Sequence, residues 1–218
     1  YQRRVRGQVM QQQTFYQQYV EDCLREAELH EYFCREIREA GYSGCTFRRF
    51  FNNVEITVRV AELELVQGKN HERIHQIEAV IAQRLHLPLD NVTIFCDKIV
   101  ARGLCADILA DQLQIKIEKQ TPIRQAAMQI IKSALRAGAA GCEVVVSGKL
   151  RQQRANCQKY KEGKIITAGK PGKDFIDKAI RHIPLKQGII GIQVKVFNLK
   201  MKDKFGRNQI MPDQVEIK

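Results

Sequence analysis

The sequence predicts a mixed α/β (α+β) protein of two domains, and two observations carry this prediction. Segments with apolar residues at helical spacing alternate with segments in which every second residue is apolar. The charge also changes near residue 98. Residues 19–98 hold 10 Lys and Arg against 14 Asp and Glu, whereas residues 99–218 hold 23 against 10. We therefore expect a basic extension over 1–18, a first domain over 19–98, a second domain over 99–199 and a tail over 200–218.

The composition excludes several classes of protein. Apolar residues make up 44% and charged residues 28% of 218 residues, which is typical of a soluble globular protein. No apolar run is long enough to cross a membrane, and the basic, glutamine-rich start does not resemble a secretory signal. The seven cysteines form no Cys-x-x-Cys pair, so we expect small buried residues in a reducing compartment, without a thiolate zinc site or a cofactor.

The first domain is expected to alternate helices and strands in a specific order. Apolar residues recur at helical spacing before Gly41, and Asn52-Asn53 is typical of a turn between two strands. The predicted elements are a helix over 19–40, strands over 45–51 and 54–61, a short helix ending at Gly68, a helix over 71–86, and a strand over 92–96.

This order is that of a type II KH domain, an RNA-binding module with a Gly-x-x-Gly loop that clamps nucleotide backbone. The corresponding loop reads Gly68-Lys69-Asn70-His71, and Lys69, Asn70 and Arg73 are its candidate RNA contacts. His71 replaces the second glycine, which normally lets phosphate approach the backbone, so we expect weakened clamping. A second match, Gly41-Tyr42-Ser43-Gly44, is interpreted as a simple turn.

The second domain is expected to place two helices on a small sheet. Thr121-Pro122 is typical of a helix start, with a capping residue and then proline at the first helical position. The predicted elements are helices over 102–119 and from 121 to about 137, a strand over 143–148, a strand over 164–168, a short helix over 174–183, and a strand over 189–197.

Basic residues of the second domain form two groups. On the second helix, Arg124, Met128, Lys132 and Arg136 fall about 40° apart, which makes a basic stripe on one face. The alternative is a solvated face without a ligand. The segment after the first strand is the most basic in the chain, and such cations bind phosphates without reading sequence. Its candidate nucleic-acid phosphate contacts are Lys149, Arg151, Arg154, Lys159 and Lys161.

His71-Glu72-Arg73-Ile74-His75 matches the His-Glu-x-x-His pattern of zinc hydrolases. On a helix the two imidazoles share one face, and Glu72 would serve as the base. A catalytic zinc needs a third protein ligand, and neither Asp90 nor Asp97 fits a known pattern. The favoured interpretation is therefore that His71 starts the helix and His75 lies on its surface, without an enzyme activity.

Longer motifs resemble a known family. The segment 141–151, GCEVVVSGKLR, is similar to the signature of the small-subunit ribosomal protein S-three family. Arg102-Gly103-Leu104-Cys105-Ala106, Arg181-His182, the segment 187–192 and Met211-Pro212-Asp213-Gln214-Val215 resemble its eukaryotic members. The resemblance implies a type II KH domain followed by an α/β domain, with Arg102 among the RNA-binding candidates.

The resemblance also implies partners and a place in the cell. These are rRNA of the small-subunit head, mRNA at the channel through which it enters the ribosome, neighbouring head proteins, and a propeller scaffold at the C-terminal tail. The protein would be cytoplasmic, with a nucleolar stage during assembly. The family has an Arg-Arg pair where this chain has Arg124-Gln125, and bacterial members have Lys at Met128. Lys132 and Arg136 would compensate. An alternative function is DNA binding and repair outside the ribosome.

Overall fold

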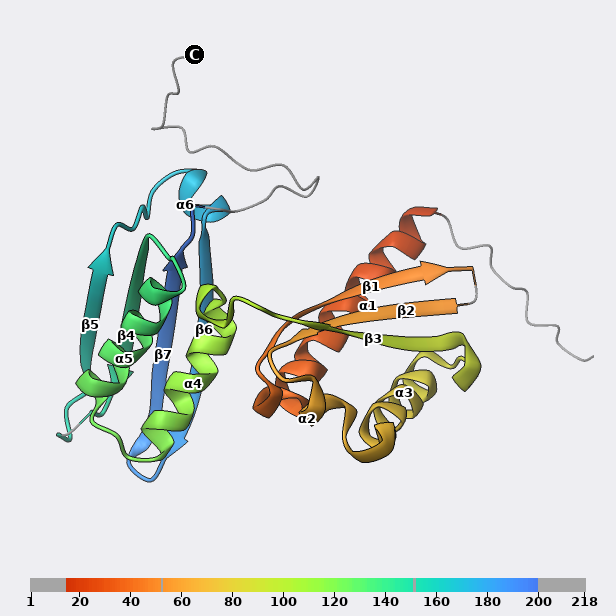
Figure 1. The fold of residues 1–218 in the computed structure, drawn as a ribbon, viewed down its shortest axis with the longest axis horizontal. Coiled ribbons are helices and arrows are strands. Elements are labelled where there is room, and N and C mark those ends of the chain that lie inside the picture. Colours follow the sequence, from red (N-terminus) through yellow and green to blue (C-terminus); the bar gives the residue numbers. More distant parts are fainter. Residues whose placement is uncertain (1–14, 52, 151, 200–218) are drawn as a thin grey trace, which may run out of the picture.

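The computed structural model describes residues 15–51, 53–150 and 152–199. Two domains lie side by side, each a β-sheet with helices packed on it, and the chain crosses once between them after β3 (Val92–Lys98) (Figure 1). The expected extension 1–18 is only partly described. Its residues 15–18 belong to the first helix, and residues 1–14 lie outside the described chain, as does the tail 200–218.

The first domain has the predicted order of helices and strands. Its three-stranded sheet runs β1-β2-β3, with the first pair antiparallel and the second parallel. In β2 the side chains of Val54, Ile56, Val58 and Val60 are buried against the helices, as their alternation predicts. The elements before β3 are α1 (Phe15–Glu36), η1 (Arg38–Ala40), β1 (Tyr42–Phe50), β2 (Asn53–Val60), α2 (Leu63–Gln67), η2 (Lys69–His71), α3 (Glu72–Leu85) and η3 (Leu89–Asn91).

The second domain is a four-stranded antiparallel sheet in the order β5-β4-β7-β6. Helices α4 and α5 cover one face, where Cys142, Val144 and Val146 of β4 join their apolar side chains in one core (Figure 1). The elements are η4 (Arg102–Leu104), α4 (Ala106–Glu118), α5 (Ile123–Arg136), β4 (Gly141–Gly148), β5 (Asn156–Gly163), α6 (Pro171–Asp174), β6 (Ile176–Leu185) and β7 (Gly188–Phe197).

Two predicted elements of this domain are wrong. The segment 174–183, predicted as a helix, lies mostly in strand β6, because a hairpin pairs Ile176–Leu185 with β7 residue by residue. Segment 164–168 forms no strand. The strand is instead β5, within the basic segment, where Gln158 and Tyr160 face the helices and pair with β4. Pairing with a distant strand overrides local propensity in both places.

Three smaller expectations also differ from the structure. Gly41 ends η1 with φ 70°, but Tyr42 begins β1, so this Gly-x-x-Gly match is a strand start rather than a simple turn. Pro122 lies just before α5 instead of at its first helical position. Of the seven cysteines only Cys45 and Cys142 are buried, and all seven are free thiols.

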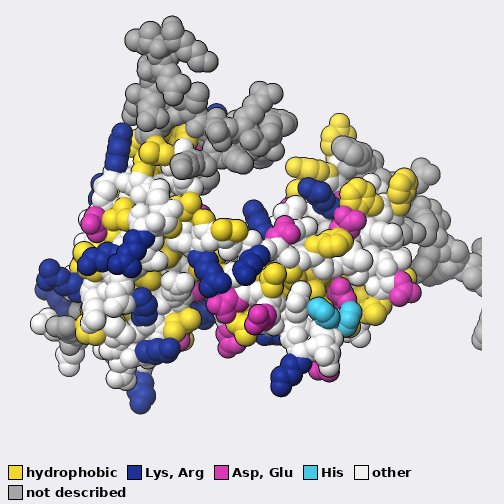
Figure 2. Space-filling view, viewed as in Figure 1, with side chains coloured by type: hydrophobic (Ala, Val, Ile, Leu, Met, Phe, Trp, Pro, Cys, Tyr) yellow, Lys and Arg dark blue, Asp and Glu magenta, His cyan; other side chains and the backbone are white. Residues whose placement is uncertain are grey.

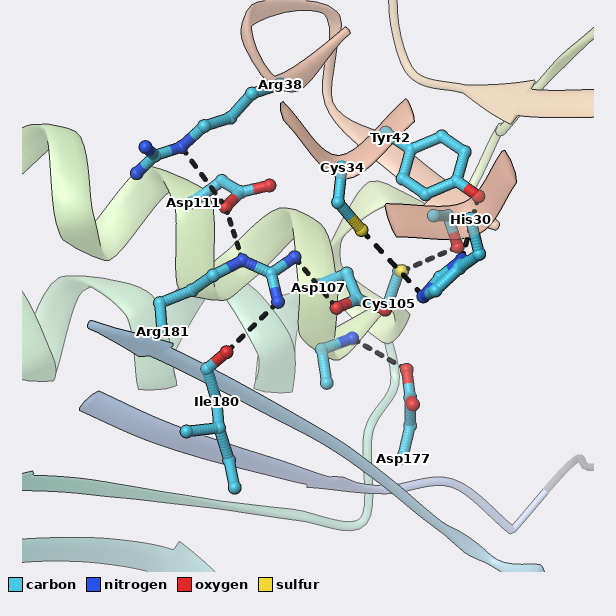
Figure 3. A network of polar contacts seen from close by, with 12 residues as sticks. His30, Cys34, Arg38, Tyr42, Cys105, Asp107, Asp111, Asp177, Ile180 and Arg181 are labelled. Carbon is cyan, nitrogen blue, oxygen red and sulfur yellow. Dashed lines mark hydrogen bonds and ion pairs between the residues drawn. The ribbon is translucent and has the colours of Figure 1, made fainter. Parts of the chain in front are cut away.

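A polar network joins the two domains at α4 (Figure 3). Arg181 of β6 donates hydrogen bonds from Nε to Asp111 and from Nη2 to Asp107, both at 2.9 Å. From the first domain, Nε of Arg38 lies 3.7 Å from the same Asp111 carboxylate. The backbone N–H of Ala106 donates to Asp177 of β6 at 2.7 Å, which satisfies an amide at the start of α4. The network therefore fixes α4 against its own sheet and against the first domain.

Candidate nucleic-acid interface

The basic stripe predicted on α5 lies on the surface. Arg124, Lys132 and Arg136 are exposed, whereas Met128 between them is half-buried and packs on the core. The opposite face of the helix is fully apolar, so burial of that face fixes the direction in which the three cations point. The residues that bury it are Ala126, Ala127, Ile130, Ile131 and Ala134.

Charge is distributed unevenly over the molecule. Figure 2 shows Lys and Arg side chains gathered over the second domain, while Asp, Glu and hydrophobic side chains mix over the first. Nucleic-acid backbone binds where cations are concentrated. The second domain therefore offers the better surface for RNA, and the charge asymmetry of the sequence indicated the same.

The basic segment after β4 divides between a connection and a strand. Lys149 and Arg154 are exposed in the β4–β5 connection, and Arg151 lies outside the described residues. Lys159 and Lys161 lie on β5, on the sheet face away from α4 and α5. The structure therefore places Lys159 and Lys161 on a different surface from the α5 stripe.

Glu143 of β4 is a charged site residue that the sequence pattern did not single out. Its side chain is only 1% exposed and accepts hydrogen bonds from Lys195 and Lys159, each at 3.0 Å. Burial would raise the pKa of this carboxyl, but the two lysines outweigh that effect and lower its pKa. Glu143 therefore stays ionised and holds both ammonium groups in place. Its position inside an apolar strand was the available signal.

The KH loop adopts a backbone that glycine favours. Gly68, Asn70 and His71 have φ values of 70°, 54° and 62°, so two residues with side chains occupy the left-handed region. The side chains of Lys69 and His71 are exposed, and no side chain caps the short helix η2 that they belong to. The expectation that His71 hinders backbone clamping stays a prediction. The left-handed conformation of His71 also costs the folded protein some backbone strain.

Arg73 supports this loop from within the fold. Its guanidinium donates to the Leu65 carbonyl at 2.9 Å and to the Glu36 carbonyl at 3.0 Å. A Cβ on Gly68 would come within 3.0 Å of the Arg73 Cβ, so the glycine also permits close packing here. Arg73 therefore joins the ends of α1 and α2 to the start of α3, in addition to its predicted RNA contact.

Comparisons with known proteins agree with both halves of the fold. A KH domain model matches residues 28–103, and a model of the ribosomal protein S3 C-terminal domain matches residues 113–196. The small ribosomal subunit protein uS3 of Candida albicans is 40% identical over 198 residues, which cover 91% of this chain and 78% of that protein.

The chain belongs to the uS3 family. The uS3 of Schizosaccharomyces pombe is 37% identical over 199 residues, covering 91% of this chain and 79% of the relative. That of Dictyostelium discoideum is 40% identical over 179 residues, covering 82% of each. Family membership makes the protein a structural constituent of the small ribosomal subunit, in the cytoplasm, with rRNA and ribosomal proteins as its partners.

Arg102 has internal contacts in this uS3 member. It pairs with Glu62 at 3.1 Å and donates to the Ala61 carbonyl at 3.0 Å. These contacts attach η4 to the end of β2, at the boundary between the domains. Arg102 therefore contributes to the domain junction, and its RNA contact stays a prediction.

The zinc hydrolase alternative does not hold, because uS3 is a family of structural proteins and not of enzymes. His71 and His75 are exposed, and Nδ1 of His75 lies 3.0 Å from a carboxylate oxygen of Glu78. Across residues 15–51, 53–150 and 152–199, no three His, Cys, Asp or Glu side chains are grouped to hold a metal ion. Within the same ranges no helix is long and apolar enough to cross a membrane.

Proposed function

We propose that the exposed face of α5 contacts mRNA where it enters the small subunit, through Arg124, Lys132 and Arg136. The observation that carries this proposal is the stripe itself: three exposed cations on a helix of 14 residues whose other face is buried. Lys and Arg contacts to phosphate carry no sequence information, as a surface that meets every mRNA requires.

We also propose that the β4–β5 connection holds rRNA through Lys149, Arg151 and Arg154. This division of roles assigns mRNA to α5 and rRNA to the β4–β5 connection. Lys69, Asn70, Arg73 and Arg102 are secondary rRNA contacts in the same proposal, because two of them already hold parts of the fold together.

One further partner and one location belong to the proposal as well. The tail 200–218, which lies outside the described residues, would meet a propeller scaffold protein through Met211–Val215. During assembly the protein would pass through the nucleolus before it reaches the cytoplasm. The repair alternative would need DNA to bind the same cations, so no described feature favours it over RNA.

The test of the α5 assignment measures mRNA release from small subunits that carry the charge-reversed variant Arg124→Glu/Lys132→Glu/Arg136→Glu. One mRNA extends through the channel, and a matched mRNA ends before it. The proposal predicts faster release of the long mRNA only, by about ten-fold at moderate salt for the loss of several phosphate contacts. Equal release rates of the long mRNA from variant and unmodified subunits would overturn the assignment.

A further inference from the structure

The face of the second sheet that α4 and α5 leave open carries a row of charged residues across all four strands, with a lysine on three of them. Strand register places Lys161 of β5, Glu143 of β4, Lys195 of β7 and Lys178 of β6 directly beside one another. Neighbouring strands lie about 4.8 Å apart, so the row spans roughly 14 Å. Lys159 adds a fifth charged side chain two residues from Lys161 along β5, on the same face.

The rest of this open face mixes polar and small apolar side chains, and the residues of its two outer strands are the most accessible. The other residues of this face are cross-strand partners in the same register, and each lies on the side of the sheet away from α4 and α5. Lys159, Lys161 and Lys178 are exposed, and Ile180 is 49% exposed. The open face consists of Cys157, Lys159, Lys161, Glu143, Val145, Ser147, Gly191, Gln193, Lys195, Lys178, Ile180 and His182.

Glu143 organises the row rather than cancelling it. It is the single acid among those twelve residues, and hydrogen bonds from Lys159 and Lys195 satisfy its buried carboxylate. Four lysines and one glutamate leave an excess of three positive charges. The ammonium groups of Lys159 and Lys195 are therefore held close together without their full mutual repulsion, which preorganises these two for a polyanion.

We propose that this open face binds the phosphate backbone of rRNA, with Lys161, Lys178, Lys195 and Lys159 as the contacts and Glu143 as the residue that positions Lys159 and Lys195. The proposal rests on the proposed RNA-binding function of the second domain and gives that domain a surface on its sheet, opposite the α5 stripe. The chemistry favours RNA over a protein partner, because lysine is depleted from protein interface cores and four lysines lie together on this face. Its largely exposed aliphatic residues are Ile180, beside the row, and Ile189, at the far end of β7 from the row.

One experiment identifies the partner directly. A photo-crosslinking amino acid replaces Ile180 in the full chain, and a control chain carries it at Val80 on α3, which is also 49% exposed. Small subunits are purified from cells that express each chain and are then irradiated. Crosslinks from position 180 to rRNA, absent from position 80, are the expected result. Crosslinks from position 180 to a protein alone would overturn the proposal.

A second measurement separates this inference from the proposed function. The purified full-length variant Lys161→Gln/Lys178→Gln is titrated against an rRNA transcript of the small-subunit head at several salt concentrations. The matched control Lys170→Gln/Lys173→Gln removes the same charge from two exposed lysines in and beside α6. Loss of two phosphate contacts reduces the slope of log affinity against log salt by about 2, and the control leaves it unchanged.

The outcomes distinguish the two proposals. In one outcome Lys161→Gln/Lys178→Gln keeps the full salt dependence of RNA affinity, while Lys149→Gln/Arg154→Gln loses part of it. The open face then does not bind RNA, and the proposed function stands. If neither variant changes the slope, RNA binding by these surfaces of the second domain fails as well. Circular dichroism of each variant excludes unfolding as the cause of a reduced slope.

Discussion

The guanidinium of Arg181 and the carboxylate of Asp111 form a nearly buried ion pair, with Nε donating to Oδ1 at 2.9 Å. Asp111 is 4% exposed, and Arg38 of the first domain approaches the same oxygen at 3.7 Å. One carboxylate on α4 therefore contacts cations from both domains. This arrangement connects the second domain to the KH domain through charge as well as through the chain.

Replacing Arg181 should strongly destabilise the protein. Arg181→Met leaves the buried Asp111 without its main partner, and breaking one side of a buried pair costs about 3–5 kcal/mol in the free energy of unfolding. Urea denaturation measures this loss. In the control Arg35→Met, an exposed pair with Glu31 is broken, and the expected loss is below about 1 kcal/mol. Similar losses in both variants would show that the Arg181 pair has no special weight.

The pH dependence of Arg181→Met gives a second readout of the same pair. Burial raises the pKa of Asp111, and Arg181 opposes that rise. Without the arginine the pKa of Asp111 rises further, so the folded variant favours the protonated acid. The loss in free energy of unfolding, relative to the unmodified protein, therefore grows as pH increases. We expect a smaller loss of stability near pH 4 than near pH 7. A loss that is the same at both values would contradict this account.

Glu143→Gln should flatten the acid branch of the stability curve. The folded pKa of Glu143 lies below its ordinary value of 4.5, because Lys195 and Lys159 outweigh the effect of burial. The stabilisation from its ionised form is therefore present above pH 4.5 and is lost as pH falls through the lowered folded pKa. Denaturation from about pH 3 to pH 7 compares the two proteins. Parallel curves would show that Glu143 does not titrate as its contacts require.

His71→Gly should stabilise the KH domain. His71 has φ 62°, a left-handed conformation that costs a residue with a side chain roughly 1–2 kcal/mol, while glycine adopts it freely. Allowing for the entropy of glycine, we expect a gain of about 1 kcal/mol in thermal or urea unfolding. His75→Gly, inside helix α3, is the opposite control and should cost about 1 kcal/mol. Destabilisation by both changes would contradict a strained loop at His71.

Charge reversal in the β4–β5 connection should impair assembly. Arg151→Glu/Arg154→Glu replaces two phosphate-binding cations with acids that repel rRNA, so we expect a reduced fraction of the variant in small subunits and polysomes. Sucrose-gradient sedimentation of cell lysate with detection of the tagged chain measures that fraction. The variant Lys170→Glu/Lys173→Glu carries the same charge change elsewhere. Normal incorporation of the first variant would refute its rRNA role.

The spacing of apolar residues along the chain predicted those helices and strands that bury one face against the core of their own domain. The alternation of Val54, Ile56, Val58 and Val60 predicted the buried face of β2, and the apolar spacing on α5 predicted which way Arg124 faces. Strand β6 was predicted as a helix, because its hairpin with β7 determines its conformation and leaves only a weak local pattern.

The candidate site was only partly predictable for a related reason. Lys159 and Lys161 were found from the density of charge along the chain. Lys178 and Lys195 stand singly in the sequence, and sheet register alone brings them beside Glu143. The Asp111–Arg181 pair likewise joins residues 70 positions apart, which no local pattern reveals.

The most direct test of the RNA-handling role of α5 uses mRNA that carries 4-thiouridine at positions inside the channel. Small subunits that contain this protein are loaded, irradiated and digested, and the crosslinked peptides are sequenced. We predict crosslinks to the peptide over 123–136, which the variant Arg124→Glu/Lys132→Glu/Arg136→Glu reduces while the variant still assembles into subunits. Crosslinks confined to other head proteins, with the same yield from the variant, would contradict the account.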